Sequence, residues 1–146
     1  MLKGISPLLS PQLLKVLAEM GHGDTLVIGD ANFAAASMAR DRILVRADGL
    51  PTEKLADAIL QLFPLDDWAE APVILMGLED SKGELQPLDQ CKAIRAVVAK
   101  HEPEAAQKCR VVDREAFYAL ARDAYAVVAA GETHRYGCVI FQKGIC

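Results

Sequence analysis

Two glycines bracket a histidine in the segment Gly21-His22-Gly23-Asp24. A histidine imidazole titrates near neutral pH, so it can take up a proton and give it back under physiological conditions. Flanking glycines permit a tight reversal in which the backbone can approach a ligand. The alternative is a solvated histidine that closes a helix and is stabilised by the helix dipole. His22 is therefore a candidate general acid–base that needs support from other residues.

The same segment does not fit a nucleotide-binding loop. A dinucleotide fingerprint requires a strand before it, a third glycine within it and a helix after it. Here a helical pattern precedes the glycines, Leu26 stands where the third glycine would be, and a strand pattern follows. The sequence thus excludes nucleotide binding at this loop.

Charged side chains follow two predicted strands. Asp30 comes after the apolar run 25–28, and Arg46 and Asp48 come at the end of the run 42–46. Open α/β sheets assemble their sites at the carboxyl ends of strands, which makes these residues candidates for ligand binding. An aspartate there can instead bond its own turn, and a neighbouring arginine and aspartate can simply pair. Both interpretations stay open.

One arginine and two tyrosines could add a cation and aromatic surface. Arg114 and Tyr118 lie four residues apart and so share one face of a predicted helix. The alternative is a surface arginine beside a half-buried tyrosine. Tyr136-Gly137 opens the last predicted strand, where glycine permits close approach and tyrosine offers a flat ring with a polar tip.

Hydrophobic periodicity predicts alternating helices and strands. Helices are expected over residues 11–20, 52–62, 89–100 and 113–121, and strands over 25–28, 42–46, 73–78, 109–112, 125–129 and 138–142. Ser10, Thr52 and Asp113 are the expected N-caps. Leu62 should face the sheet, and Pro103 should end the helix over 89–100.

This alternation predicts an α/β fold, with helices layered against a mixed, largely parallel sheet. We expect a three-layer α/β/α arrangement. A length of 146 residues fits one ordinary domain, and no linker or internal repeat interrupts the chain. The expected domain therefore spans residues 1–146.

Composition excludes several functional classes. Sixteen Lys and Arg against 20 Asp and Glu leave a formal net charge of −4, so the basic excess that phosphate binding requires is missing. The longest apolar runs, 72–76 and 124–130, fall far short of the ~18 residues of a bilayer span. The N-terminal segment lacks the apolar region of a secretory signal. We expect no nucleic-acid partner, no membrane insertion and a cytoplasmic location.

The cysteines indicate the same compartment. Cys91, Cys109, Cys138 and Cys146 form no C-x-x-C pair, and no histidine stands at zinc-ligand spacing. A chain with 52% hydrophobic residues can build a core without disulfides. We expect four reduced thiols and no metal site.

Several of these segments together resemble the sugar mutarotase family that contains L-fucose mutarotases and ribose pyranases. The resemblance runs nearly end to end and rests on segments in the family's order at compatible spacing, namely residues 1–7, 14–24, 46–49, 117–118, 131–132 and 136–137. The turn Arg46-Ala47-Asp48-Gly49 favours the fucose branch. Residues 79–110 are the least similar part.

The resemblance implies the family's fold and a cofactor-independent isomerase that exchanges the α and β anomers of L-fucose or a related pyranose. It implies that His22 is the catalytic acid–base, while Asp30 anchors the sugar or orients the imidazole. The substrate-binding residues that it implies are Asp30, Arg114, Tyr118, Tyr136, Gly137 and Cys138. Members usually have asparagine where this chain has Cys138, so sugar affinity should differ if that side chain contacts the ligand. Asn32 falls where members vary, and we assign it no role.

The resemblance also implies a homo-oligomer, a ring-like decamer with sites near subunit contacts. Two alternative functions stay open. A non-catalytic sugar-binding accessory protein would need Asp30 and Arg114 but no titrating His22. The other alternative is an enzyme of the same fold acting on ribose or another pentose, which exchange rates for fucose, galactose and ribose would distinguish.

Overall fold

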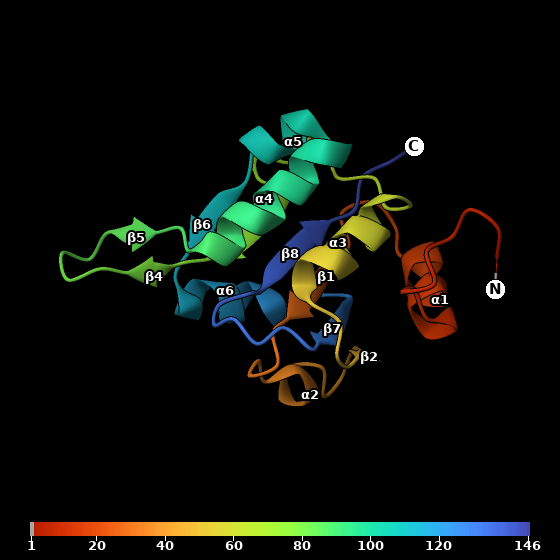
Figure 1. The fold of residues 1–146 in the computed structure, drawn as a ribbon, viewed down its shortest axis with the longest axis horizontal. Coiled ribbons are helices and arrows are strands. Elements are labelled where there is room, and N and C mark those ends of the chain that lie inside the picture. The colour runs from red at the N-terminus through yellow and green to blue at the C-terminus, as the bar shows by residue number, and fades with distance from the viewer. Residues whose placement is uncertain (1) are drawn as a thin grey trace.

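A computed structural model describes residues 2–146, and within that range the chain forms a six-stranded sheet with helices on both faces (Figure 1). The strands of this sheet are β1 (Thr25–Gly29), β2 (Ile43–Ala47), β3 (Val73–Met76), β6 (Arg110–Val112), β7 (Ala126–Ala130) and β8 (Val139–Gln142). The helices are α1 (Pro11–Glu19), α2 (Ala35–Met38), α3 (Thr52–Leu60), α4 (Asp89–His101), α5 (Pro103–Gln107) and α6 (Arg114–Ala121). A separate hairpin joins β4 (Leu78–Glu79) to β5 (Leu85–Gln86).

The sheet is mixed and largely parallel, as the sequence predicts. Its strand order is β2-β7-β1-β8-β3-β6. β2, β7 and β1 pair in parallel, and so do β3 and β6. β8 runs antiparallel to both β1 and β3, with Ile140 opposite Val27 on one side and Ile74 on the other. The other five strands therefore all point the same way, and their carboxyl ends share one edge of the sheet with the start of β8.

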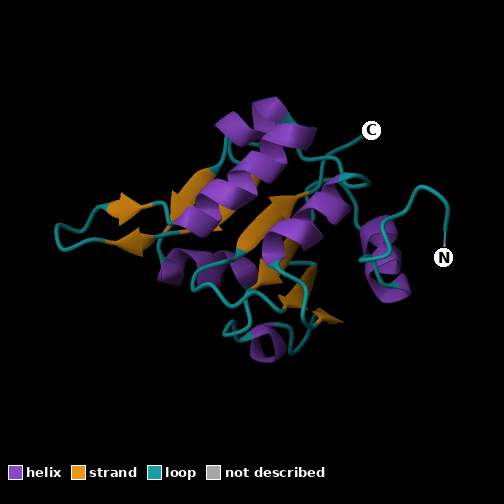
Figure 2. Cartoon of the chain, viewed as in Figure 1, coloured by secondary structure: helices purple, strands orange, loops and turns teal. Residues whose placement is uncertain are grey.

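Two apolar cores make the fold a three-layer α/β/α arrangement (Figure 2). One sheet face packs against α1, α3, α4 and α5. The opposite face packs against α6 and the short α2, with Phe117 of α6 fully buried. Because α2 has four residues and α6 has eight, the second face is the more thinly covered one.

Local capping explains where two helices begin. The Ser10 side chain accepts a hydrogen bond from the Leu13 amide at 3.1 Å, and Pro11 occupies the first helical position. Asp113 accepts from the Ala116 amide at 2.8 Å and starts α6 directly after β6. Both predicted caps are confirmed.

The predicted cap at Thr52 is wrong, and so is the inward orientation of Leu62. Pro51 is the N-cap of α3 without a side-chain bond, and Thr52 is the first helical residue. The Thr52 hydroxyl instead donates to the Gly137 carbonyl at 2.7 Å. α3 ends at Leu60, which leaves Leu62 outside the helix and 40% exposed.

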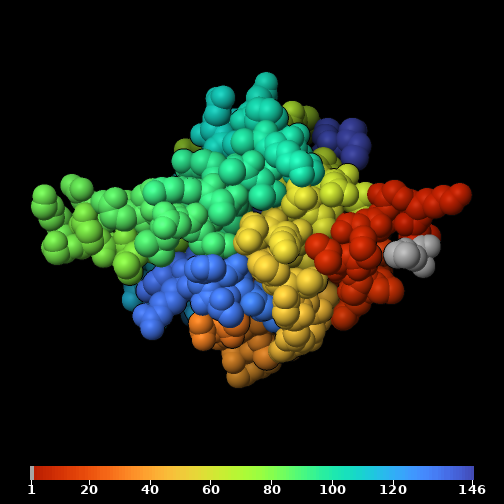
Figure 3. All heavy atoms as spheres, viewed as in Figure 1, coloured from red at the N-terminus to blue at the C-terminus, as the bar shows by residue number. Residues whose placement is uncertain are grey.

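The segments around residues 77–86 and 103 also differ from expectation. The predicted strand 73–78 breaks at Gly77, where a Cβ would lie 2.4 Å from the Val111 side chain. The chain then leaves the sheet as the β4–β5 hairpin, which projects from the body at the left of Figure 3. α4 ends at His101, and Pro103 starts α5 rather than only stopping α4, because proline fits a first helical turn. No helix within residues 2–146 combines the length and the apolar character needed to cross a bilayer.

Candidate sugar-binding site

A cavity of about 340 Å³ opens at the carboxyl edge of the sheet. Its lining residues are Asp30, Asn32, Phe33, Met76, Arg114, Tyr118, Arg135, Tyr136 and Cys138. The volume falls in the range of small-molecule sites. The structure thus brings together five of the six residues expected to bind substrate, from segments up to about a hundred positions apart. The sixth, Gly137, lies between two lining residues.

Asp30 fits both interpretations left open by the sequence. Its Oδ1 accepts the Asn32 amide at 2.9 Å, which is the turn bond expected of an aspartate after a strand. The same side chain lines the cavity and is buried. The turn bond uses one carboxylate oxygen, so Asp30 still has acceptor capacity for a ligand.

Cys138 lies directly behind Asp30. The Asp30 amide donates to the Cys138 sulfur at 3.3 Å. Burial, together with the nearby Asp30 carboxylate, raises the pKa of the Cys138 thiol far above its ordinary value. Cys138 is therefore a neutral thiol at physiological pH and offers a ligand only a weak donor.

α6 presents Arg114 and Tyr118 to the cavity from one face, as their spacing predicts. The Tyr118 ring lies 4.9 Å from the Phe33 ring, and Phe33 packs edge-on against Phe117 at 6.1 Å. The aromatic wall of the cavity is thus anchored in the buried core beneath it. Arg46 and Asp48, by contrast, pair with each other, Nε to Oδ2 at 3.1 Å, and lie outside this cavity.

Tyr136 enters the cavity from a tight turn before β8. The Gly137 amide donates to the His134 carbonyl at 3.3 Å, which closes the turn 134–137. Tyr136 has φ +62°, and no other non-glycine residue within 2–146 has a positive φ. A tyrosine in a conformation that favours glycine is held there by its surroundings.

His22 lies at the opposite edge of the sheet. It precedes β1, whereas Asp30 follows β1, and five strand residues span roughly 16 Å. His22 does not line the cavity that contains Asp30 and Arg114. Within one chain, the structure therefore separates the predicted acid–base from the predicted sugar-binding residues.

The neighbours of His22 are Asp66 and Trp68. Nε2 of His22 lies 3.2 Å from Oδ2 of Asp66, and the Trp68 ring stands edge-on to the imidazole at 5.2 Å. Burial alone would raise the pKa of the Asp66 carboxyl, but hydrogen bonds from His22, the Trp68 amide and Gln142 outweigh it and hold that pKa below its ordinary value. Asp66 is therefore ionised at neutral pH. Asp66, and not Asp30, orients the imidazole within the chain.

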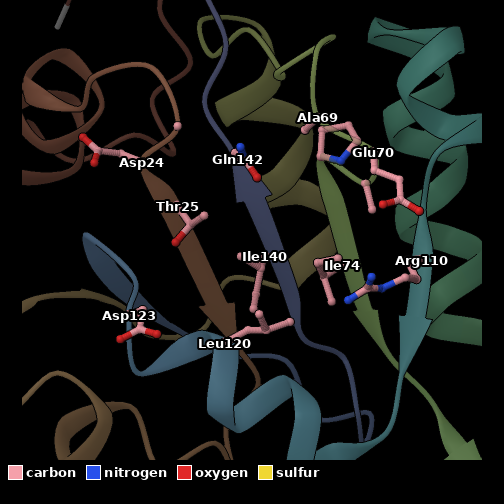
Figure 4. Close-up of a pocket in the computed structure, with 13 residues that line it drawn as sticks. Asp24, Thr25, Ala69, Glu70, Ile74, Arg110, Leu120, Asp123, Ile140 and Gln142 are labelled. Atoms are coloured by element: carbon pink, nitrogen blue, oxygen red, sulfur yellow. The ribbon is translucent and has the colours of Figure 1, made fainter.

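A larger hollow of about 550 Å³ borders the His22 loop through Gly23 and Asp24 (Figure 4). Ile74 and Ile140 on adjacent strands and Leu120 of α6 are the largest apolar side chains that line it. This hollow lies where the second helix layer leaves the sheet uncovered. Leu120 is exposed there, and Trp68 beside His22 is 72% exposed.

Several residues that line the cavity or surround His22 were not predicted from the sequence. Phe33, Met76 and Arg135 line the cavity, and their only sequence signal is position, since each stands within four residues of the start or end of a strand. Asn32, to which we assigned no role, lines it as well. Asp66 had no signal that linked it to His22, because 44 positions separate the two residues and only the folded sheet edge joins them.

Comparison with known proteins identifies the family. The sequence family described as the RbsD / FucU transport protein family matches residues 3–146. This chain belongs to that family. The resemblance noted in the sequence is thus confirmed.

Relatives and solved structures agree over the full length. The chain is 44% identical to the L-fucose mutarotase of Histophilus somni (strain 2336), over 99% of this chain and 97% of that protein. FucU from Bifidobacterium longum superposes with a TM-score of 0.90 at 40% identity, over 99% of both chains. The fucose mutarotase of Streptococcus pneumoniae, solved in complex with L-fucose, gives a TM-score of 0.87 at 38% identity, over 99% of both chains. The predicted α/β fold class is confirmed by these structures.

Proposed function

We propose that this RbsD / FucU family member is a cofactor-independent mutarotase that interconverts the α and β anomers of L-fucose. The observation that supports it most is the single cavity at one sheet edge. It is lined by the Asp30 carboxylate, the Arg114 guanidinium and the rings of Tyr118 and Tyr136. The names of its relatives and the L-fucose complex of a similar structure support the same substrate. The described cysteines are unpaired, which accords with the reducing cytoplasm as the proposed location.

The cavity residues hold the sugar in this proposal. The Asp30 carboxylate accepts hydrogen bonds from sugar hydroxyls, and Arg114 donates to sugar oxygens. The rings of Tyr118 and Tyr136 cover the apolar face of the pyranose. Phe33, together with Met76, supplies an apolar wall suited to the methyl group of fucose.

His22 moves the protons. Ring opening removes a proton from the anomeric hydroxyl, breaks the bond between the anomeric carbon and the ring oxygen, and places a proton on that oxygen. The resulting aldehyde rotates and the ring closes by the reverse steps, so no net proton or electron is consumed. When Nε2 of His22 donates to Asp66, Nδ1 is the basic nitrogen that accepts the hydroxyl proton. Asp66 also stabilises the imidazolium that then forms, because its carboxylate is ionised.

Because His22 and the cavity lie at opposite edges of the sheet, His22 can act on a bound sugar only if it comes from a second copy of the chain. We propose that His22 of one copy reaches the Asp30 cavity of its neighbour in a homo-oligomer, in line with the ring-like decamers that the family resemblance implies. The hollow beside His22, with its exposed Leu120 and the nearby Trp68, is the surface that such a neighbour would cover. A site shared between copies makes activity depend on assembly.

The proposal is tested by anomer exchange rates of L-fucose, galactose and ribose, measured by saturation-transfer NMR with and without the protein. We expect fucose to be accelerated most, by about tenfold or more over the other two sugars, because an apolar wall discriminates by about 1–3 kcal/mol per methyl-sized group. Greater acceleration of ribose would instead support the pentose enzyme.

The separation of His22 from the cavity specifically favours a second candidate, a non-catalytic sugar-binding protein, if the chain works as a monomer. Such a protein would bind fucose without accelerating exchange at any pH. A mutarotase that uses His22 as its acid–base should show an exchange rate that depends on pH. The pH profile of exchange, beside calorimetric binding, separates the two functions.

Exchanging Cys138 for asparagine is expected to tighten fucose binding by up to about tenfold or leave it unchanged. Cys138 is a neutral thiol with weak hydrogen-bonding capacity, whereas an amide could accept from the Asp30 amide and donate to a sugar hydroxyl. One added hydrogen bond is worth about 0.5–1.5 kcal/mol. Titration calorimetry on Cys138→Asn measures the effect, with Cys109→Ser as a control outside the cavity. A marked loss of affinity in Cys138→Asn alone would contradict this role.

A further inference from the structure

We propose that Glu132 is a positioning residue that keeps the Tyr136 turn in its left-handed conformation and so aims the phenol ring into the sugar cavity. The inference rests on the proposed function for its consequence in sugar binding.

The Tyr136 turn is strained. Tyr136 occupies the third position of the turn 134–137 with φ +62°, a place usually taken by glycine or asparagine. Steric contact of the Cβ disfavours a non-glycine residue in this region, so the free turn would favour another conformation. Relaxation of the turn would move two cavity residues at once, because Arg135 precedes Tyr136 and both line the cavity.

The Glu132 carboxylate binds His134, the first residue of this turn. Oε1 accepts the His134 amide at 2.8 Å and lies 2.6 Å from Nδ1 of the same histidine. Glu132 is only 3% exposed. Burial alone would raise the pKa of its carboxyl, but the bonds from His134 and Thr52 outweigh this and hold the pKa below its ordinary value. An ionised, buried carboxylate therefore fixes the first residue of the turn on two sides.

The second carboxylate oxygen ties the turn to the helix layer. Oε2 accepts the Thr52 amide at 3.3 Å from α3 and the Gln90 side chain at 3.0 Å from α4. The Thr52 hydroxyl then donates to the Gly137 carbonyl at 2.7 Å, on the far side of Tyr136. The strained residue is thus held between two anchors that meet at Glu132.

The backbone at Gly137 packs closely against Glu132 and Gln90. A Cβ at this position would lie 2.5 Å from Cγ of Glu132 and 3.2 Å from Cγ of Gln90. The backbone after Tyr136 therefore passes directly against the Glu132 side chain. On the other side, the Glu132 carbonyl accepts the Ala31 amide at 2.8 Å, next to the cavity residue Asp30.

A purely structural role would also fit a buried carboxylate that joins α3 to α4, so the test needs a readout of Tyr136 itself. Glu132→Gln keeps the shape but removes the charge and an acceptor oxygen. We expect the fucose Kd of this variant to rise about tenfold, the equivalent of ~1.4 kcal/mol. We also expect the three-bond scalar coupling between the α proton of Tyr136 and the carbonyl carbon of Arg135, which is largest near φ +60°, to fall in this variant when measured by NMR.

A double-mutant cycle separates positioning from stability. Tyr136→Gly removes the ring and the strain together, so Glu132→Gln should have no further effect on Kd in that background. Asp57→Asn is the matched control. Asp57 of α3 accepts Lys100 of α4 at 2.9 Å and pairs with His101 at 2.7 Å, but lies outside the cavity. Its loss should lower the free energy of unfolding without changing the fucose Kd.

Three outcomes would overturn the inference: an unchanged Kd in Glu132→Gln, a full Glu132→Gln effect persisting in Tyr136→Gly, or an unchanged Tyr136 coupling. If Glu132→Gln fails to fold, Thr52→Val tests the other anchor, since it removes the hydroxyl bond to Gly137 and keeps the side-chain shape. If the unmodified protein binds no fucose, the proposed function fails, while the Tyr136 coupling still decides the positioning role of Glu132.

Discussion

Replacing His22 by alanine should slow protein-catalysed anomer exchange of L-fucose by about 10²–10⁴-fold, the usual contribution of a positioned general acid–base. His22 has a 38% exposed side chain and lies in a loop outside the two apolar cores. The fold should therefore persist, and fucose affinity should change little because Asp30 and Arg114 remain. Saturation-transfer NMR measures the exchange rate, and circular dichroism verifies the fold. An unchanged exchange rate would refute the catalytic role.

The position of His22, at the sheet edge opposite the cavity, allows a second test with mixed chains. If the imidazole serves the cavity of a neighbouring copy, His22→Ala and Asp30→Ala chains are each inactive alone. Mixed and reassembled, they form some sites that combine an intact His22 from one chain with an intact Asp30 from the other. Exchange activity should then return in part. Failure to recover activity, with mixed oligomers verified by mass spectrometry, would show that the site is not shared between copies.

The second large effect is expected in stability. Phe117→Ala should lower the free energy of unfolding by about 3–5 kcal/mol, the usual cost of truncating a buried phenylalanine. Phe117 is fully buried and supports Phe33, which in turn packs against Tyr118 at the cavity. Urea unfolding followed by fluorescence measures the change.

Leu62→Ala is the control, because Leu62 lies outside both apolar cores. Leu62 is 40% exposed, so its truncation should alter the free energy of unfolding by only about 0.5 kcal/mol. A Phe117→Ala effect as small as that of Leu62→Ala would show that the second core contributes little to stability.

Much of the fold and of the sugar cavity could be predicted from sequence because the signals are local. Apolar periodicity marks strands and helices, and the carboxyl ends of parallel strands meet at one edge whatever the strand order. Asp30 and Arg114 stand next to such ends, so their convergence follows from the α/β pattern itself. Tyr136 joins them because β8 runs antiparallel to β1 and β3, which brings the start of β8 to the same edge. Local signals also explain the errors at Thr52 and Leu62. Threonine is a preferred N-cap, but the Thr52 hydroxyl bonds the Gly137 carbonyl, 85 positions away. Apolar spacing extends the predicted helix to Leu62, but α3 ends at Leu60.

The amino-acid sequence by itself determined most of the helices and strands and the chemical types of the candidate site residues, since short-range spacing suffices for these, and its motifs carried the resemblance to the family. Only the tertiary structure decided that Asp66 orients the imidazole, that Tyr136 joins Asp30 in one cavity, and that Glu132 contacts the start of the Tyr136 turn. These relations depend on β8 entering the sheet between β1 and β3 and on contacts between segments far apart in sequence. Such contacts form when the whole chain packs, and no local propensity specifies them.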